Sequence, residues 1–198
     1  IIWAPMGDTF RYVWPNLDDT KAVTKRIVLA ELSKLFDPLG LVNPLIVRAK
    51  IFMQDLWILK LDWDESLPMN LHSQWTEFRE KLKDVENVSV PRFVLAEKKF
   101  VRVEMHGFAD ASKRAYGCCV YIRTVCDDDD AKVHLWSAKS RVAPLKTQSL
   151  PRLELLGAEL LSKLVTKTKG NFPIAIDGTY LWTDSEIVLD WLNEHPSN

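Results

Sequence analysis

The sequence lacks any long apolar run. No stretch approaches the roughly 18 consecutive apolar residues that a membrane-spanning helix needs, and each long segment with helical periodicity carries Lys, Arg, Asp or Glu. The first residues, "IIWAPMGDTF", lack both the basic start of a signal peptide and an initiator methionine. We therefore expect an intracellular, cytoplasmic protein that makes no use of a membrane and is a fragment of a longer chain.

Cysteine is scarce, and its spacing excludes the common cysteine sites. The three cysteines are Cys118, Cys119 and Cys126. Adjacent residues of a strand point to opposite faces, and no pair has the CxxC spacing that is typical of a metal site. We expect buried thiols in a reducing compartment.

The net charge of −1 does not indicate a nucleic-acid-binding protein. The segment from Ala131 to Lys169 differs, because its eight basic and two acidic residues give +6 against −7 for the remainder. A phosphate backbone would favour such a segment, although a solvated basic helix face explains the charges equally well. Its candidates for phosphate contacts are Lys139, Arg141 and Arg152.

The first 90 residues have a mostly helical pattern. Residues 1–14 indicate a hairpin with a turn at Gly7 and Asp8. Apolar residues then recur at near-helical spacing over residues 18–36, 43–59 and 71–82, which predicts three helices. Asp19 or Thr20 is expected to cap the first helix, and Asn43 the second.

Alternating apolar and polar residues dominate the rest of the chain. The runs "FVRVEMHGFAD", "YGCCVYIRTV" and "KVHLWSAKSRV" predict three antiparallel strands in a meander. A helix from Ser149 to Lys169, a strand ending at Asp184 and a final helix from Ser185 are expected to follow. This order predicts an α/β fold whose fourth strand runs parallel to the first.

Three acidic residues stand out by their positions. Asp110 interrupts one hydrophobic strand and Asp184 closes another, so both lie at one sheet edge if these strands are parallel neighbours. On a helical wheel Glu154 lies inside the apolar arc, whereas Glu159 lies on the polar face. A buried glutamate needs a partner, which would be a basic side chain or a cation shared with the two aspartates. Mg²⁺ prefers such oxygen ligands.

Four sequence blocks taken together carry a family resemblance. "FDPLGL", "FADAS", "PRLEL" and "WTDS", in this order, resemble the polyprotein of BEL/Pao-type LTR retrotransposons, and the resemblance covers essentially the whole chain. It implies a reverse transcriptase thumb and connection region over residues 1–90. It also implies an RNase H-like domain, incomplete at its C-terminus, over residues 91–198.

The resemblance also implies an activity. Asp110, Glu154 and Asp184 match the family's carboxylates, which bind two Mg²⁺ ions and cut the RNA strand of an RNA–DNA hybrid; a fourth ligand is expected downstream of Asn198. Ser112 would assist beside Asp110, unless it serves only the local turn. The implied partners are the hybrid and the remainder of the reverse transcriptase polyprotein, in the cytoplasm, a virus-like particle or the nucleus.

Two other functions stay open at this point. The same polyprotein region is also described as a Pao retrotransposon peptidase, and an aspartic peptidase needs two carboxylates that share a proton. "ADAS" and "TDSE" lack the glycine of an Asp-Thr/Ser-Gly loop. The third alternative is a non-catalytic connection module that grips nucleic acid.

Overall fold

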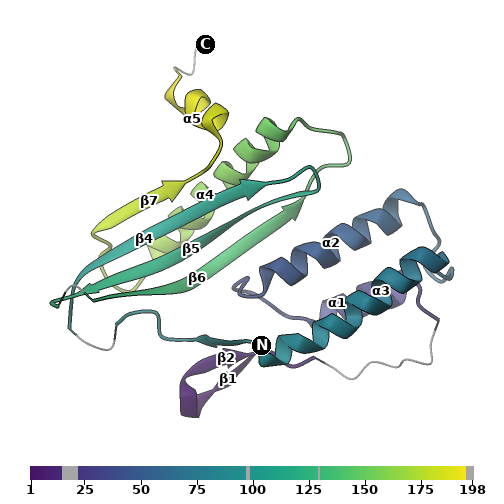
Figure 1. The fold of residues 1–198 in the computed structure, drawn as a ribbon, viewed down its shortest axis with the longest axis horizontal. Coiled ribbons are helices and arrows are strands. Elements are labelled where there is room, and N and C mark those ends of the chain that lie inside the picture. Colours follow the sequence, from purple (N-terminus) through teal and green to yellow (C-terminus); the bar gives the residue numbers. More distant parts are fainter. Residues whose placement is uncertain (15–21, 97–98, 129, 195–198) are drawn as a thin grey trace. The chain divides into compact units, whose positions relative to one another are not determined.

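The computed structural model describes residues 1–14, 22–96, 99–128 and 130–194. The chain divides into two compact units. Unit 1 comprises Ile1–Pro38 and Pro44–Phe93, and unit 2 comprises Leu39–Asn43 and Val94–Asn198. The predicted α/β architecture is confirmed (Figure 1). Within the described ranges, no helix is both long and apolar enough to cross a membrane.

Unit 1 combines a small sheet with helices. The hairpin expected over residues 1–14 is present, and a third strand from the end of the unit pairs with it in the order β1-β2-β3. Asp8 takes a left-handed conformation after the turn, with φ of 44°, and binds Arg92 through two hydrogen bonds. The elements are β1 (Ile2–Ala4), β2 (Thr9–Arg11), α1 (Lys25–Lys34), α2 (Asn43–Ile58), α3 (Met69–Leu82) and β3 (Ser89–Pro91).

The prediction for the start of the first helix was wrong. Helix α1 begins at Lys25, and Thr24 caps it by accepting a hydrogen bond from the Ile27 N–H at 3.3 Å. Thr24 itself is extended and forms a β-bridge with Ser66, and the Val23 carbonyl accepts a hydrogen bond from the Leu67 N–H. Because of this long-range pairing, the helix starts later in the chain than the apolar spacing predicts. The predicted caps Asp19 and Thr20 lie outside the described residues.

A buried ion pair lies in the core of unit 1. Arg79 Nη2 is 3.4 Å from Glu31 Oε1, and the two side chains are 9% and 6% exposed. The fully buried Trp75 donates a hydrogen bond from Nε1 to Glu31 Oε2 at 3.1 Å, and its ring stacks on Phe52. One glutamate therefore joins α1 to α3 through both a charge and an aromatic ring.

Unit 2 is built on the expected sheet. Three long antiparallel strands form a meander, and the fourth strand runs parallel to the first, in the order β6-β5-β4-β7. The strands are β4 (Phe100–Ala111), β5 (Ala115–Cys126), β6 (Ala131–Val142) and β7 (Gly178–Trp182). All three cysteines are free thiols, and Cys118 and Cys126 are buried.

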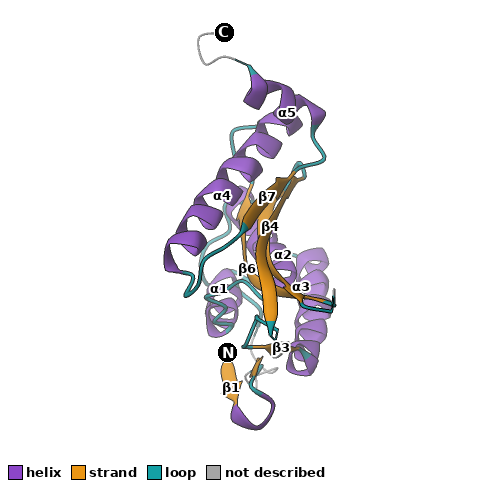
Figure 2. Cartoon of the chain, turned by 90° about the vertical axis from the view of Figure 1, so that its left-hand side faces the viewer, coloured by secondary structure: helices purple, strands orange, loops and turns teal. Residues whose placement is uncertain are grey.

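Helix α4 (Leu150–Asn171) covers one face of this sheet (Figure 2). It packs closely, because a Cβ on Gly107 of β4 would lie 2.6 Å from Leu161 Cδ1. The wheel is largely confirmed: the buried residues of α4 are Leu153, Gly157, Leu160, Leu161, Leu164, Val165 and Thr168. Glu159 is exposed, as expected, and Glu154 is half-buried. Helix α5 (Glu186–Asn193) follows β7.

A short piece of the N-terminal sequence belongs to unit 2. The Leu39 carbonyl accepts a hydrogen bond from the Ala138 N–H of β6 at 2.9 Å, and Ser140 Oγ donates to Asn43 Oδ1 at 2.7 Å. Between them Gly40 has φ of 76°, and a Cβ there would lie 1.9 Å from the Ala138 carbonyl oxygen. Only glycine fits this approach to the outer edge of β6.

Gly40→Ala is expected to destabilise unit 2 by about 2 kcal/mol or more, because strain in the left-handed conformation adds to the clash. Gly170→Ala is the matched control. Gly170 lies near the end of α4, and an added Cβ meets no atom within 4 Å, so this change should stabilise the protein by about 0.5–1 kcal/mol. Urea unfolding measures both variants. Equal stability of Gly40→Ala and the unmodified chain would contradict the expectation.

Candidate active site

Asp110 lies at the C-terminal end of β4, one residue before the strand ends. It pairs with Gly117 of β5, and its side chain is exposed. Its Oδ1 accepts a hydrogen bond from the adjacent Ala111 N–H at 2.6 Å. The carboxylate therefore stands at the surface with one oxygen bound to local backbone.

Asp184 lies beside the same end of the sheet. β4 and β7 are parallel, and their last paired residues are Phe108 and Trp182. Two residues beyond this pair the chain reaches Asp110 on one side and Asp184 on the other, and Asp184 is also exposed. The carboxyl ends of neighbouring parallel strands share one edge, where ligands bind in open α/β sheets. The predicted parallel pairing of these strands is confirmed, and it puts the two aspartates at one sheet edge.

Aromatic side chains stack across β4 and β7, on the face opposite α4. His106 stacks on Tyr180 with ring centroids 5.0 Å apart, and Phe108 stacks on Trp182 at 6.3 Å. Trp182 Nε1 also donates to His106 Nδ1 at 3.4 Å. Cross-strand pairs of this kind stabilise one register. The stack therefore helps to hold the register that brings Asp110 and Asp184 to matching positions.

Glu154 reaches the same region from α4. Its Oε2 accepts a hydrogen bond from Ser185 Oγ at 2.5 Å, and Ser185 directly follows Asp184. One turn along α4, a Cβ on Gly157 would lie 3.4 Å from the Asp110 carbonyl oxygen. The first turns of α4 thus approach the end of β4, while Glu154 binds the junction between β7 and α5. The partner of Glu154 is a serine and not the arginine or lysine that the sequence left open.

The three carboxylates share an edge without forming a closed metal site. Among the described residues, no group of three Asp, Glu, His or Cys side chains is spaced to hold a metal ion. The donor set still suits a hard divalent cation in its chemistry, because carboxylate oxygens are the ligands that Mg²⁺ prefers. Asp110 and Asp184 are exposed side chains, so both can rotate toward a cation at this edge.

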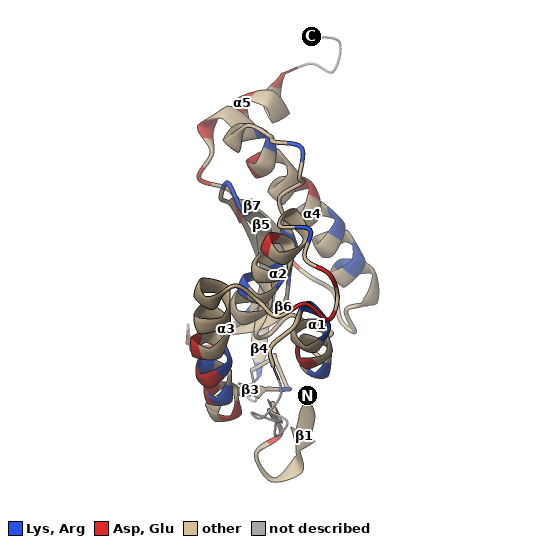
Figure 3. Ribbon diagram, turned by 90° about the vertical axis from the view of Figure 1, so that its right-hand side faces the viewer, with Lys and Arg blue, Asp and Glu red and all other residues tan. Residues whose placement is uncertain are grey.

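The candidate nucleic-acid contacts differ in their surroundings. Lys139 and Arg141 alternate along β6, Arg152 lies in the first turn of α4, and all three are exposed. Figure 3 shows basic residues along α4 and acidic ones on α5. Ser112 Oγ donates to the Ala115 carbonyl at 3.1 Å and accepts from the Ala115 N–H at 3.2 Å. The contacts of Ser112 are those of a residue that closes the β4–β5 turn.

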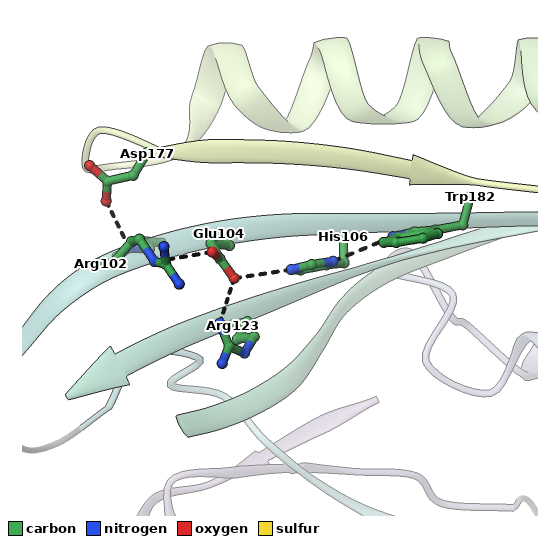
Figure 4. A network of polar contacts seen from close by, with 7 residues as sticks. Arg102, Glu104, His106, Arg123, Asp177 and Trp182 are labelled. Carbon is green, nitrogen blue, oxygen red and sulfur yellow. Dashed lines mark hydrogen bonds and ion pairs between the residues drawn. The ribbon is translucent and has the colours of Figure 1, made fainter. Parts of the chain in front are cut away.

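A buried charge network on β4 was not predicted from the sequence (Figure 4). The Glu104 side chain is 6% exposed; its Oε2 accepts from Arg123 at 2.6 Å and contacts His106 Nε2 at 3.2 Å, and its Oε1 lies 3.1 Å from Arg102. Burial raises the pKa of Glu104, but the hydrogen bonds and positive charges outweigh it and lower that pKa below its ordinary value of 4.5. The only sequence signal was a glutamate within the strand-like run "VRVEMH".

Glu104→Gln is expected to destabilise unit 2 near neutral pH and to lose this effect in acid. Because the folded-state pKa is lowered, the ionised carboxylate contributes stability above the unfolded-state value of about 4.5, and this contribution disappears as the pH falls through the folded-state pKa. Unfolding free energies of both proteins between pH 7 and pH 3 measure the difference. A difference that stays constant over this range would contradict the expectation.

A family model described as "Pao retrotransposon-like RNaseH-like domain" matches residues 24–185. One similar solved structure is described as "Structure of the foamy viral protease-reverse transcriptase dRH in complex with ds DNA". It is 14% identical with a TM-score of 0.37, over 83% of this chain and 29% of that chain. A similarity this weak carries no argument. No curated protein matches the sequence significantly.

Proposed function

Because the chain belongs to the Pao retrotransposon-like RNaseH-like domain family, we propose that it cuts the RNA strand of RNA–DNA hybrids in a Mg²⁺-dependent reaction during reverse transcription. The observation that carries this proposal is the meeting of three carboxylate-bearing elements at one sheet edge. β4 brings Asp110, the β7–α5 junction brings Asp184, and α4 brings Glu154.

Each of these residues has a distinct part in the proposed site. Asp110 and Asp184 would hold Mg²⁺ from the ends of parallel strands, and Glu154 would add a carboxylate fixed to the β7–α5 junction. Bound Mg²⁺ supplies an activated water and neutralises charge on the leaving oxygen. Asp110 is held by its neighbour's N–H, so its second oxygen is available for a ligand.

The substrate would be positioned by exposed basic side chains. Lys139, Arg141 and Arg152 carry positive charge in the segment with the chain's basic excess, and phosphate groups would bind them. Such contacts do not distinguish RNA from DNA. Discrimination would rest on the 2′-hydroxyl groups of the RNA strand.

Nothing in the site favours the aspartic peptidase. That reaction needs two carboxylates that share one proton. Here Asp110 is bound to local backbone, and the carboxylate with a hydroxyl partner at 2.5 Å is Glu154, on a helix. A half-buried glutamate from a helix has no part in a peptidase dyad, whereas in the proposed nuclease it would be the third metal ligand.

The test is cleavage of an end-labelled RNA–DNA hybrid by the full 198-residue chain. Cleavage of the RNA strand is expected with Mg²⁺, is expected to stop with EDTA, and should be absent on duplex DNA of the same sequence. Gel-shift measurements run in parallel. Hybrid binding without cleavage at any Mg²⁺ concentration would reject the nuclease in favour of a gripping module, and pepstatin-sensitive proteolysis would favour the peptidase.

A further inference from the structure

Ser185 occupies the joint between Glu154 and helix α5. Its Oγ donates to Glu154 Oε2 at 2.5 Å and accepts from the Val188 N–H at 3.3 Å, as an N-cap does. The side chain is buried, with 7% of the residue exposed. One hydroxyl thus links α4 to the first turn of α5, across 31 residues of sequence.

The direction of these hydrogen bonds follows from the chemistry of a hydroxyl. A serine has one O–H to donate and lone pairs to accept. The cap uses a lone pair, because the Val188 N–H is the donor. The single proton is therefore committed to Glu154 Oε2.

Resting on the nuclease function proposed above, we propose that Ser185 is a positioning residue that holds the Glu154 carboxylate in place for the divalent cation. The hydrogen bond joins Glu154 Oε2 to Ser185, the residue that follows Asp184 in the sequence. The other carboxylate oxygen, Oε1, would then be left for the cation. Without it, Glu154 is a flexible side chain on a half-buried face of α4. The cation would then have to order that side chain as well as bind it, which weakens its binding.

A role as a cap alone makes a different prediction. Glycine replaces serine at an N-cap with a loss of only a few tenths of a kcal/mol, but it has no hydroxyl to offer Glu154. Threonine keeps both the cap and the hydroxyl. The pair Ser185→Gly and Ser185→Thr therefore separates support of α5 from support of Glu154.

The experiment uses the full chain with ¹³C-labelled glutamate carboxyl groups. Glu154→Gln identifies the Glu154 resonance by its disappearance. That resonance is expected to shift in Ser185→Gly and to stay near its original position in Ser185→Thr. The Mg²⁺ concentration for half-maximal hybrid cleavage is expected to rise about tenfold in Ser185→Gly, because a hydrogen bond to a charged group is lost, and to return close to the original value in Ser185→Thr.

Each other outcome overturns the proposal in a different way. An unchanged Glu154 resonance in Ser185→Gly would show that the hydroxyl does not bind the carboxylate. A shifted resonance with an unchanged Mg²⁺ requirement would show that the contact exists but does not position Glu154 for the cation. A shifted resonance in a chain that cleaves no hybrid would remove the nuclease function, and the positioning role with it, while the contact itself would stand.

Discussion

Asp110→Asn is expected to lower the rate of Mg²⁺-dependent hybrid cleavage by at least about 100-fold, because a metal ion contributes several kcal/mol to stabilising charge in the transition state. Asparagine has the size of aspartate, and its amide oxygen can still accept the Ala111 N–H that Asp110 Oδ1 accepts at 2.6 Å. The side chain is exposed and leaves no cavity when it changes. Folding should therefore be unaffected, so that a single-turnover cleavage rate reports the charge alone.

Glu159→Gln is the matched control for this loss of charge. Glu159 lies on the same unit, on the exposed side of α4, where it pairs with Lys163 one turn along the helix. Its hydrogen bond and charge partner lower the pKa of Glu159, so the residue is ionised near neutral pH. Surface changes of this kind are usually small, and cleavage should change by no more than about twofold. Equal losses in both variants would indicate an effect of net charge instead of a site.

The largest expected effect on stability belongs to unit 1. Glu31→Gln should lower the free energy of unfolding by about 3–5 kcal/mol, because removing one partner of a buried ion pair leaves the other charge uncompensated. Glutamine can still accept the Trp75 Nε1–H that Glu31 accepts at 3.1 Å, so the variant isolates the loss of charge opposite Arg79. Urea unfolding gives the magnitude, and amide hydrogen exchange in α3 locates it.

Two controls show whether the loss comes from the buried charge. Glu31→Gln combined with Arg79→Met removes both charges, keeps an acceptor for the buried Trp75 Nε1–H, and should restore much of the stability, since replacing a whole buried pair by neutral groups is often close to neutral. Glu77→Gln breaks the exposed pair with Lys81 on the same helix, and exposed pairs contribute little. A double variant as unstable as Glu31→Gln would place the effect in packing.

The strands and helix α4 of unit 2 could be predicted, because the spacing of apolar residues within each segment indicates its secondary structure. Apolar and polar residues alternate in "FVRVEMHGFAD" and in the two strand-like runs that follow it. Successive side chains of a strand point to opposite faces, so this alternation predicts both the strand and the face on which each residue lies. The 100° periodicity of α4 assigned Leu153, Leu161 and Val165 to the sheet and Glu159 to solvent, as observed. The same periodicity sets Glu154 apart from Glu159.

The remaining features depend on contacts between distant segments. The sequence marks Ser185 only as the start of the final helix, and its hydrogen bond to Glu154 exists because the β7–α5 junction meets α4. Arg123 lies opposite Glu104 on the neighbouring strand β5 and compensates its charge. The burial of Glu104 could therefore not be predicted from the sequence of β4 alone. The start of α1 likewise lies at Lys25 and not near residue 18, because Thr24 forms a β-bridge with the distant Ser66.

Because Leu39–Asn43 belongs to unit 2, cutting the chain at one point cannot separate the two units. The backbone leaves unit 1 after Pro38, supplies the outer edge of β6 with a hydrogen-bonding partner at Ala138, and returns to unit 1 at Pro44. An excised piece starting at Val94 would expose that edge, and a bare strand edge invites pairing with other chains. A soluble isolated form of unit 2 would therefore need the "LGLVN" peptide fused back or supplied in trans.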